Sequence, residues 1–130
     1  MNANLGAQES PQGSPGKGSK EVVLTFVNAL NRSDFQTARQ CVTDDLKFVG
    51  ALGSREGADV YFRDMERLQL KYDVKKAFAD GDEVCLFYDV TMAGVTVFCA
   101  GWYQLSDGKI RSFRVVFDPR AVLEAVGKNK

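Results

Sequence analysis

The chain has 130 residues, which is about the length of one domain. Apolar residues make up 45% and charged residues 26%, ordinary globular values that exclude a fibrous chain, and no apolar run is long enough to span a bilayer. The 17 basic and 17 acidic residues balance, so composition gives no electrostatic reason to bind nucleic acid or an anionic membrane.

Residues 1–19 are predicted to form a disordered tail. This segment is rich in glycine, proline and serine and contains no aromatic residue. Such a composition buries too little apolar surface to offset the entropy lost on ordering. The segment also lacks the apolar core of a secretory signal. We therefore expect a single folded domain over residues 20–130.

The first half of the domain has helical periodicity. A helix is predicted over residues 20–31, because Val22, Phe26 and Leu30 fall on one apolar stripe. A short second helix is expected after Asp34, whose side chain suits an N-cap position.

A short strand over 46–49 and a loop over 50–53 should follow the second helix. Ser54 is the expected N-cap of a third helix over 54–68, which carries a charged outer face.

The second half alternates as strands do. Turn residues separate the apolar runs, so the strands should form an antiparallel meander. The predicted strands cover residues 72–78, 83–92, 95–105 and 109–117. Gly101 lies inside the third of these, where it is expected to permit a bulge or a bend. A final short helix should begin at Asp118-Pro119.

Helices followed by an antiparallel meander indicate the α+β class. The helices should cover the concave face of a bent sheet. Where they do not fill that face, a cone-shaped cavity remains.

The residue types limit the chemistry. The chain has no histidine, which excludes Ser-His and Cys-His nucleophile pairs and histidine metal ligands. Cys41, Cys85 and Cys99 match no metal or redox spacing and each has apolar neighbours. Three reduced, buried thiols indicate a reducing compartment, and we expect the cytoplasm.

Several short segments carry a resemblance to a known superfamily. They are Phe26–Leu30, Ser33–Phe35, Thr43–Leu46, Asp107–Ile110 and Phe113–Pro119. In this order and spacing they resemble the nuclear transport factor 2-like superfamily, in its SnoaL-like polyketide cyclase and ketosteroid isomerase branch. The resemblance covers about residues 21–126. It implies a cystatin-like α+β roll, in which three N-terminal helices wrap a cone-shaped, bent antiparallel sheet. It also implies a pocket on the concave face and, usually, a dimer formed through the sheet.

The catalytic residues of the isomerases do not carry over to this chain. Their base falls near Gly50, their oxyanion-hole acid near Phe98 and their tyrosine near Phe26. None of these residues can perform the corresponding role. The resemblance therefore does not imply steroid isomerisation by that mechanism.

Two related mechanisms also lack their residues here. SnoaL-type cyclases use a histidine with an aspartate, and this chain has no histidine. Limonene epoxide hydrolases use an Asp-Arg-Asp set, of which only Asp89 matches, because Phe87 and Val115 occupy the other positions.

Alternation along the strands predicts which side chains face the pocket. Asp89 is expected inside, in the company of Cys85 and Thr91. The expected ligand-binding residues are apolar or aromatic: Phe26, Phe48, Tyr61, Met65, Phe87, Phe98, Trp102, Phe113, Val115 and Phe117.

Asp89 has two interpretations. Among aromatic rings its carboxyl would lose hydration, which would raise its pKa and suit it to general acid or base catalysis. Alternatively it pairs with Arg111 or Arg114, or it faces solvent, because a shift of one residue exchanges the two faces of a strand.

The sequence therefore predicts a protein that binds an apolar small molecule. It would catalyse proton transfer, isomerisation or cyclisation of an apolar carbonyl substrate, with Asp89 as the acid or base. The alternatives are a non-catalytic ligand carrier, a dimeric protein-interaction module, or a transport adaptor.

Few other partners are expected. No cofactor or metal is implied, since the chain has no phosphate-binding glycine loop and no metal-spaced carboxylate cluster. Neither nucleic acid nor a membrane is expected as a partner. A homodimer through the convex face of the sheet would use Val84, Leu86, Val97 and Val116.

Overall fold

The computed structural model describes residues 18–128. The predicted tail lies almost wholly outside this range, and Ser19 already begins the first helix. Within the described range, no helix is both long and apolar enough to cross a bilayer.

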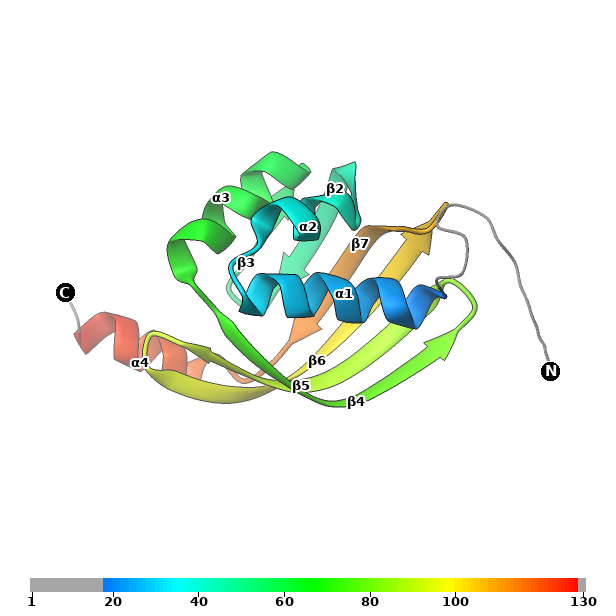
Figure 1. Cartoon of the computed structure of the whole chain (residues 1–130). Helices are drawn as coiled ribbons and strands as arrows, with labels where there is room; N and C mark the ends of the chain where they lie inside the picture. The colour runs from blue at the N-terminus through cyan, green and yellow to red at the C-terminus, as the bar shows by residue number, and fades with distance from the viewer. Residues whose placement is uncertain (1–17, 129–130) are drawn as a thin grey trace.

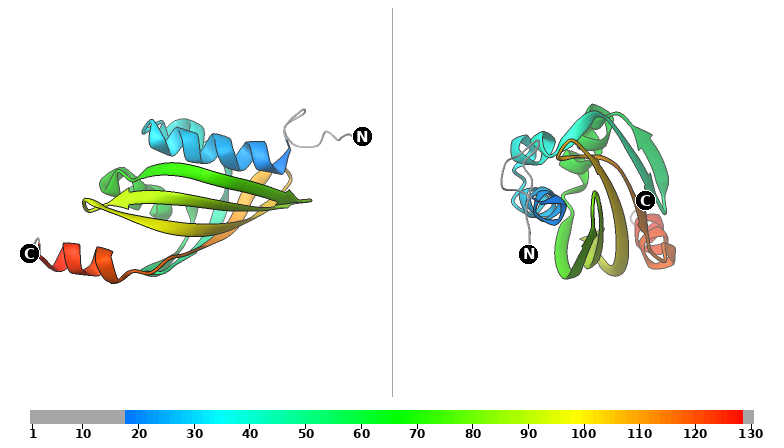
Figure 2. Two further views of the ribbon diagram at one scale, coloured as in Figure 1. Left: turned by 90° about the horizontal axis from the view of Figure 1, so that it is seen from below. Right: turned by 90° about the vertical axis from the view of Figure 1, so that its right-hand side faces the viewer.

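Three helices cover one face of a curved sheet and a fourth lies on the other side (Figures 1 and 2). They are α1 (Ser19–Asn31), α2 (Phe35–Gln40), α3 (Ala58–Leu68) and, beyond the sheet, α4 (Arg120–Lys128). The predicted capping residue of α2 is confirmed, because the Asp34 side chain accepts a hydrogen bond from the backbone N–H of Thr37 at 3.2 Å.

The sheet has six strands in the order β3-β2-β7-β6-β5-β4. Their bounds are β2 (Val42–Gly50), β3 (Gly53–Glu56), β4 (Lys71–Asp80), β5 (Glu83–Met92), β6 (Val95–Ser106) and β7 (Lys109–Val116). Neighbouring strands are antiparallel except for β2 and β7, which run parallel. The predicted α+β class and antiparallel meander are confirmed.

The segment before α3 differs from the prediction. Ser54 does not cap a helix, because Gly53–Glu56 pairs with the end of β2 as a short strand. The helix begins only at Ala58, after Gly57. Gly57 has φ +98°, a backbone conformation that glycine adopts without strain. The strand before it is also longer than predicted, since β2 begins at Val42.

Gly101 makes room for a ring and does not form the predicted bulge. It pairs in register with Leu86 of β5 and with Val115 of β7. A Cβ atom at Gly101 would lie 2.9 Å from Cε1 of Tyr103, on the same face of β6. The missing side chain therefore lets the Tyr103 ring lie along the strand.

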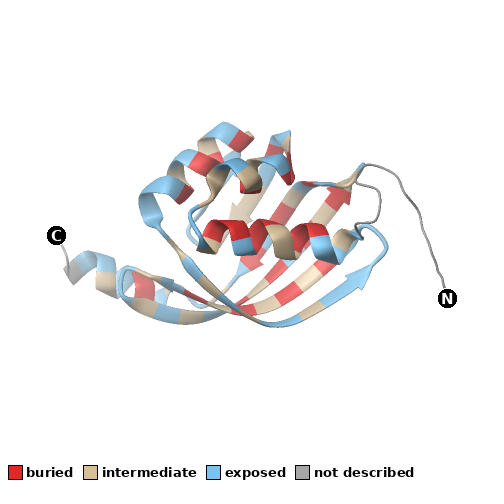
Figure 3. Cartoon of the chain, viewed as in Figure 1, coloured by how far each residue is buried: buried red, intermediate tan, exposed pale blue. Residues whose placement is uncertain are grey.

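Burial alternates along the central strands (Figure 3). In β5 the buried residues are Val84, Leu86, Tyr88 and Val90, which face the helices. This is the opposite phase from the prediction. The buried phase is wholly apolar, whereas the outer phase carries Glu83, Asp89 and Thr91, so the alternation itself favours the observed face, and the aromatic Phe87 on the outer face misled the prediction.

Asn31 fastens the end of α1 to the edge strand β4. Its Nδ2 donates to the backbone carbonyl of Tyr72 at 2.9 Å, and its Oδ1 accepts from the backbone N–H of Tyr72 at 2.7 Å. The amide thus pairs with β4 much as another strand would. Lys71 Nζ adds a hydrogen bond of 2.8 Å to the Asn31 carbonyl.

Replacing Asn31 with Ala should lower the free energy of unfolding by about 1–3 kcal/mol, because two partly buried backbone groups of Tyr72 lose their partner. Urea unfolding followed by circular dichroism measures this change. Asn28→Ala, at an exposed position of the same helix, is the matched control and should have little effect. Equal stability of the two variants would contradict the role given to Asn31.

Candidate functional site

An enclosed cavity lies between the helices and the concave face of the sheet. We call it the inner chamber, and its volume is about 60 Å³. Aromatic and aliphatic side chains form nearly all of its wall. The lining residues are Phe26, Phe48, Tyr61, Met65, Leu70, Tyr72, Tyr88, Val90, Met92, Cys99, Tyr103, Phe113, Val115 and Phe117.

A wider hollow of about 170 Å³ adjoins the inner chamber, and we call it the vestibule. The two share part of their walls, through Phe48, Tyr61, Met65, Leu70, Met92 and Phe117. The vestibule also reaches the loop after β2 and three charged residues, Arg55, Asp64 and Arg67. It therefore forms a mainly apolar entrance with charged residues on one side.

All four tyrosines of the chain line the inner chamber. Burial raises the pKa of each of the hydroxyls of Tyr61, Tyr72, Tyr88 and Tyr103. The Tyr61 hydroxyl interacts with that of Tyr72, and the Tyr88 hydroxyl with that of Tyr103. The phenols therefore stay protonated. Each interacting pair uses one hydroxyl proton, and Tyr72 Oη also donates to Met65 Sδ at 3.9 Å. A hydroxyl whose proton turns away from these partners can donate to an acceptor inside the chamber.

Ring contacts fix the walls of the chamber. The Tyr103 and Phe113 rings stack with centroids 4.8 Å apart. Phe48 lies 4.9 Å from Phe113 and 5.3 Å from Tyr61. Because such contacts lock ring orientations, the hydroxyl-bearing rings are held in place before any ligand arrives.

Cys99 places a thiol in the same wall. Burial raises the pKa of this thiol to about 11. A thiol with a raised pKa is mostly protonated near neutral pH, so it acts here as a small apolar group and not as a nucleophile.

Most of the predicted ligand-binding residues line the chamber. Those that do are Phe26, Phe48, Tyr61, Met65, Phe113, Val115 and Phe117. The predicted orientation is wrong for Phe87, Phe98 and Trp102. These three belong to the other phase of β5 and β6, and Phe98 and Trp102 are 60% and 49% exposed.

Asp89 also lies on the outer face of the sheet. It is opposite Asp73 on β4 and Phe98 on β6, and it does not line the chamber. Its Oδ2 is 3.7 Å from Lys75 Nζ, which is in turn 2.8 Å from Asp73 Oδ2. The predicted placement of Asp89 in the pocket is wrong. Its partner is neither Arg111 nor Arg114 but a lysine on the neighbouring strand.

Gly50 lies at the vestibule, where the resemblance placed the isomerase base. A Cβ atom there would be 2.7 Å from Cζ of Phe48. The Phe48 ring therefore occupies the space that a catalytic side chain would need.

The sequence reasoning missed half of the chamber wall. The missed residues are Leu70, Tyr72, Tyr88, Val90, Met92, Cys99 and Tyr103. Most of them belong to the phase of β5 and β6 that the prediction did not assign to the pocket. Gly101 preceding Tyr103 by two positions was the available signal, since a glycine on the same face leaves space for a large inward ring.

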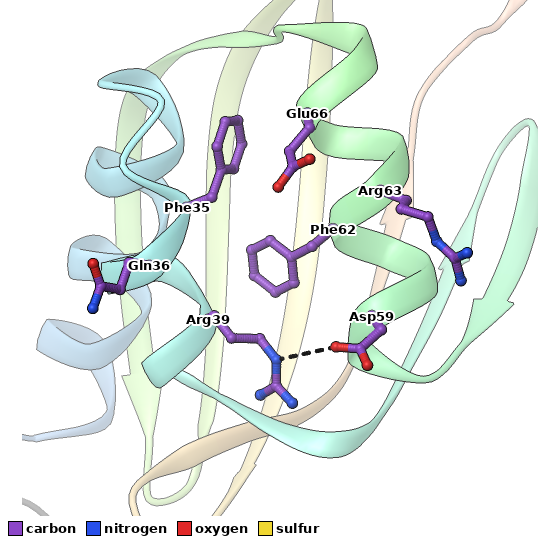
Figure 4. Close-up of a pocket in the computed structure, with 7 residues that line it drawn as sticks. All are labelled: Phe35, Gln36, Arg39, Asp59, Phe62, Arg63 and Glu66. Atoms are coloured by element: carbon purple, nitrogen blue, oxygen red, sulfur yellow. Dashed lines mark ion pairs between the residues drawn. The ribbon is translucent and has the colours of Figure 1, made fainter.

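A second hollow, of about 500 Å³, lies on the surface between α2 and α3 (Figure 4). Phe35 and Phe62 lie in the space between the two helices, and charged side chains surround them. Arg39 Nε is 3.7 Å from Asp59 Oδ1, and Arg39 Nη2 is 2.6 Å from Asp44 Oδ1. This groove is open, and Arg39, one of the two arginines that line it, is paired, so the more enclosed chamber is the stronger candidate site.

Comparison with known proteins agrees with this architecture. The model of the SnoaL-like domain family matches residues 23–113. An NTF2-like protein of unknown function from Cytophaga hutchinsonii is 41% identical, with a TM-score of 0.79 over 81% of this chain and 94% of that one. No curated protein matched the chain.

More distant structures share the fold. An LEH-like epoxide hydrolase from M. tuberculosis is 24% identical, with a TM-score of 0.68 over 85% of this chain and 90% of that one. A candidate SnoaL-like polyketide cyclase from Jannaschia sp. CCS1 is 20% identical, with a TM-score of 0.71 over 83% of this chain and 90% of that one.

Replacing Gly101 with Ala should lower the free energy of unfolding by about 1–3 kcal/mol, because the new methyl group would collide with the Tyr103 ring. Thermal and urea unfolding measure this loss. Gly127→Ala is the matched control, since a Cβ atom there meets nothing within 4 Å and alanine favours the helix. A Gly101→Ala variant as stable as the wild type would contradict the packing described.

Proposed function

Because the chain belongs to the SnoaL-like domain family and encloses an apolar chamber on its concave face, we propose that it binds a small apolar molecule there. The observation that carries this proposal is that four buried tyrosines, whose hydroxyls have raised pKa values, line one aromatic-walled chamber. Ligand sites have this composition, apolar walls with a few placed polar groups. The ligand should therefore carry an oxygen acceptor, such as a carbonyl.

The size of the site restricts the ligand. The inner chamber and the vestibule measure about 60 and 170 Å³. Both are smaller than the roughly 300 Å³ at which pockets for drug-sized ligands begin. The inner chamber alone is too small for a benzene ring, so a molecule with one ring or a short chain would occupy both adjoining spaces, and a fused-ring skeleton would not fit.

The ionisable groups favour binding over proton abstraction. In the described wall of the inner chamber they are the four tyrosines and Cys99, and burial raises the pKa of each. Such groups donate hydrogen bonds but are poor bases near neutral pH. A ligand carrier is therefore the function that this geometry supports best, ahead of an isomerase or cyclase.

The test uses acetophenone, a one-ring ketone, and ethylbenzene, which lacks the carbonyl. Acetophenone should bind more tightly than ethylbenzene. Changing Tyr61, Tyr88 or Tyr103 to Phe should weaken acetophenone binding about tenfold and leave ethylbenzene binding unchanged. Ligand-observed NMR titration gives both affinities. The same sample, followed over hours, reports any product.

Met92→Trp provides a second test of the proposed site. A larger ring at this half-buried position should block both the chamber and the vestibule. Its control is Thr91→Trp, which puts the same ring on the exposed face of the same strand. Acetophenone binding that survives Met92→Trp in a folded protein would contradict the proposed site.

The outer face of the sheet supports a second proposal, that the protein forms a homodimer. Large apolar side chains lie exposed across its strands, at Phe78, Phe98, Trp102 and Val116. Phe87 stacks on Phe98 with centroids 6.1 Å apart and meets Phe78 edge-on at 6.2 Å. An exposed aromatic patch can pack against its own copy about a two-fold axis, so a second copy would cover it.

This proposal replaces the predicted interface residues. Val84 and Leu86 are buried under the helices, and Val97 packs against the core. Only Val116 lies on the outer face as expected, where it is 56% exposed.

Phe98→Asp should convert the dimer to a monomer, because a charge at the centre of the patch would be buried without a partner. Sedimentation velocity at micromolar protein measures the mass. Gln36→Asp, which adds the same charge at an exposed position of α2, should leave the dimer intact. A wild-type protein that sediments as a monomer would refute the dimer.

The cytoplasm remains the proposed compartment. Cys85 and Cys99 carry free thiols, which supports a reducing environment.

A further inference from the structure

The charged side chains at the vestibule form one connected group. Arg55 Nε lies 2.7 Å from Asp64 Oδ2, and Arg67 Nη2 lies 3.2 Å from Asp64 Oδ1. Arg55 Nη1 also donates to the Ser54 carbonyl at 2.9 Å. Arg55 comes from β3, while Asp64 and Arg67 come from α3. The group therefore spans two elements on one side of the entrance.

This group carries an unbalanced positive charge. Burial alone would raise the pKa of Asp64, but hydrogen bonds from Arg55 and Arg67 outweigh that effect and lower it, so the carboxylate stays ionised. Two guanidinium groups then face one carboxylate, and no other charged residue of the described chain lines the vestibule. The net charge at the entrance is +1.

The arginines also keep unused donors. Among the hydrogen bonds within residues 18–128, Arg55 uses Nε and Nη1, and Arg67 uses Nη2. The Nη2 group of Arg55 and the Nε and Nη1 groups of Arg67 have no acceptor within that range. Both side chains remain accessible, at 46% and 67% exposure. Guanidinium groups with free N–H donors bind carboxylates well.

Resting on the proposed function, we propose that the natural ligand is a small amphipathic carboxylic acid. Its carboxylate binds Arg55 and Arg67 at the vestibule, and its apolar end enters the inner chamber. The structure places both halves of such a ligand in adjoining spaces, since six residues line both. A neutral ligand would leave the excess charge at the entrance without a partner.

The experiment compares 3-phenylpropanoate with 3-phenylpropan-1-ol, which share a skeleton and differ in charge. Isothermal titration calorimetry at pH 7 and low salt should show the acid binding about tenfold more tightly than the alcohol. Arg55→Gln and Arg67→Gln should each weaken acid binding by about fivefold and leave alcohol binding unchanged. Raising the salt concentration should weaken binding of the acid alone.

Arg63→Gln is the matched control. Arg63 lies on the same helix as Arg67, is exposed, and lines the groove between α2 and α3 instead of the vestibule. This variant should bind both probes as the wild type does. A loss of acid affinity as large as that in Arg67→Gln would overturn the proposal.

Asp64→Asn tests the same idea by a gain of affinity. This change removes the carboxylate that shares the two arginines and raises the net charge of the entrance to about +2. Acid binding should become several-fold tighter, which partial unfolding could not mimic. Weaker acid binding with unchanged alcohol binding would overturn the proposal.

The outcomes separate the two proposals. If the acid and the alcohol bind equally in all variants, the arginine site is refuted and the apolar chamber stands. If acetophenone and both of these probes fail to bind, the proposed function fails and the acid site fails with it.

Discussion

One cluster of aromatic rings holds the helices of this protein on its sheet. The ring centroid of Phe26 on α1 lies 6.3 Å from the centroids of Tyr61 and Phe62 on α3. It lies 6.5 Å from the centroid of Tyr103 on β6 and 5.9 Å from that of Phe113 on β7. Phe48 brings β2 into the same cluster. Rings of this cluster, Phe26, Phe48, Tyr61, Tyr103 and Phe113, also line the inner chamber. The site thus depends on the packing that stabilises the fold.

The same cluster sets the polarity of the chamber. Tyrosine is the residue that allows both tasks, since its ring packs like phenylalanine and its hydroxyl stays polar. Burial raises the pKa of these hydroxyls, so they stay protonated and remain able to donate. Among the described residues that line the chamber and the vestibule, the ionised side chains are Arg55, Asp64 and Arg67, at the entrance. An apolar interior with a charged entrance favours a ligand that is itself amphipathic.

The sequence predicted the fold better than the site, for a physical reason. Helical stripes, the Asp34 cap and the glycine turns are local signals, and they identified the helices and the meander. The face of β5 was misread although its alternation carries the information. The phase Val84-Leu86-Tyr88-Val90 is wholly apolar, whereas Cys85-Phe87-Asp89-Thr91 includes a carboxylate and a hydroxyl. The aromatic pair Phe87 and Phe98 on the outer face resembled a pocket wall, so Asp89 was placed on the wrong face. β7 has exposed arginines between its apolar residues, and there Phe113 and Val115 were placed correctly.

The central claim is that a ligand enters the chamber, and the methionine methyl groups report on this directly. Met65 and Met92 line both the chamber and the vestibule. In protein labelled with ¹³C at the methionine methyls, titration with acetophenone should move both signals along one saturable curve, because the aromatic ring of the ligand would lie beside them. Signals that stay in place at saturating acetophenone, in a protein whose spectrum is otherwise that of a folded domain, would contradict the account.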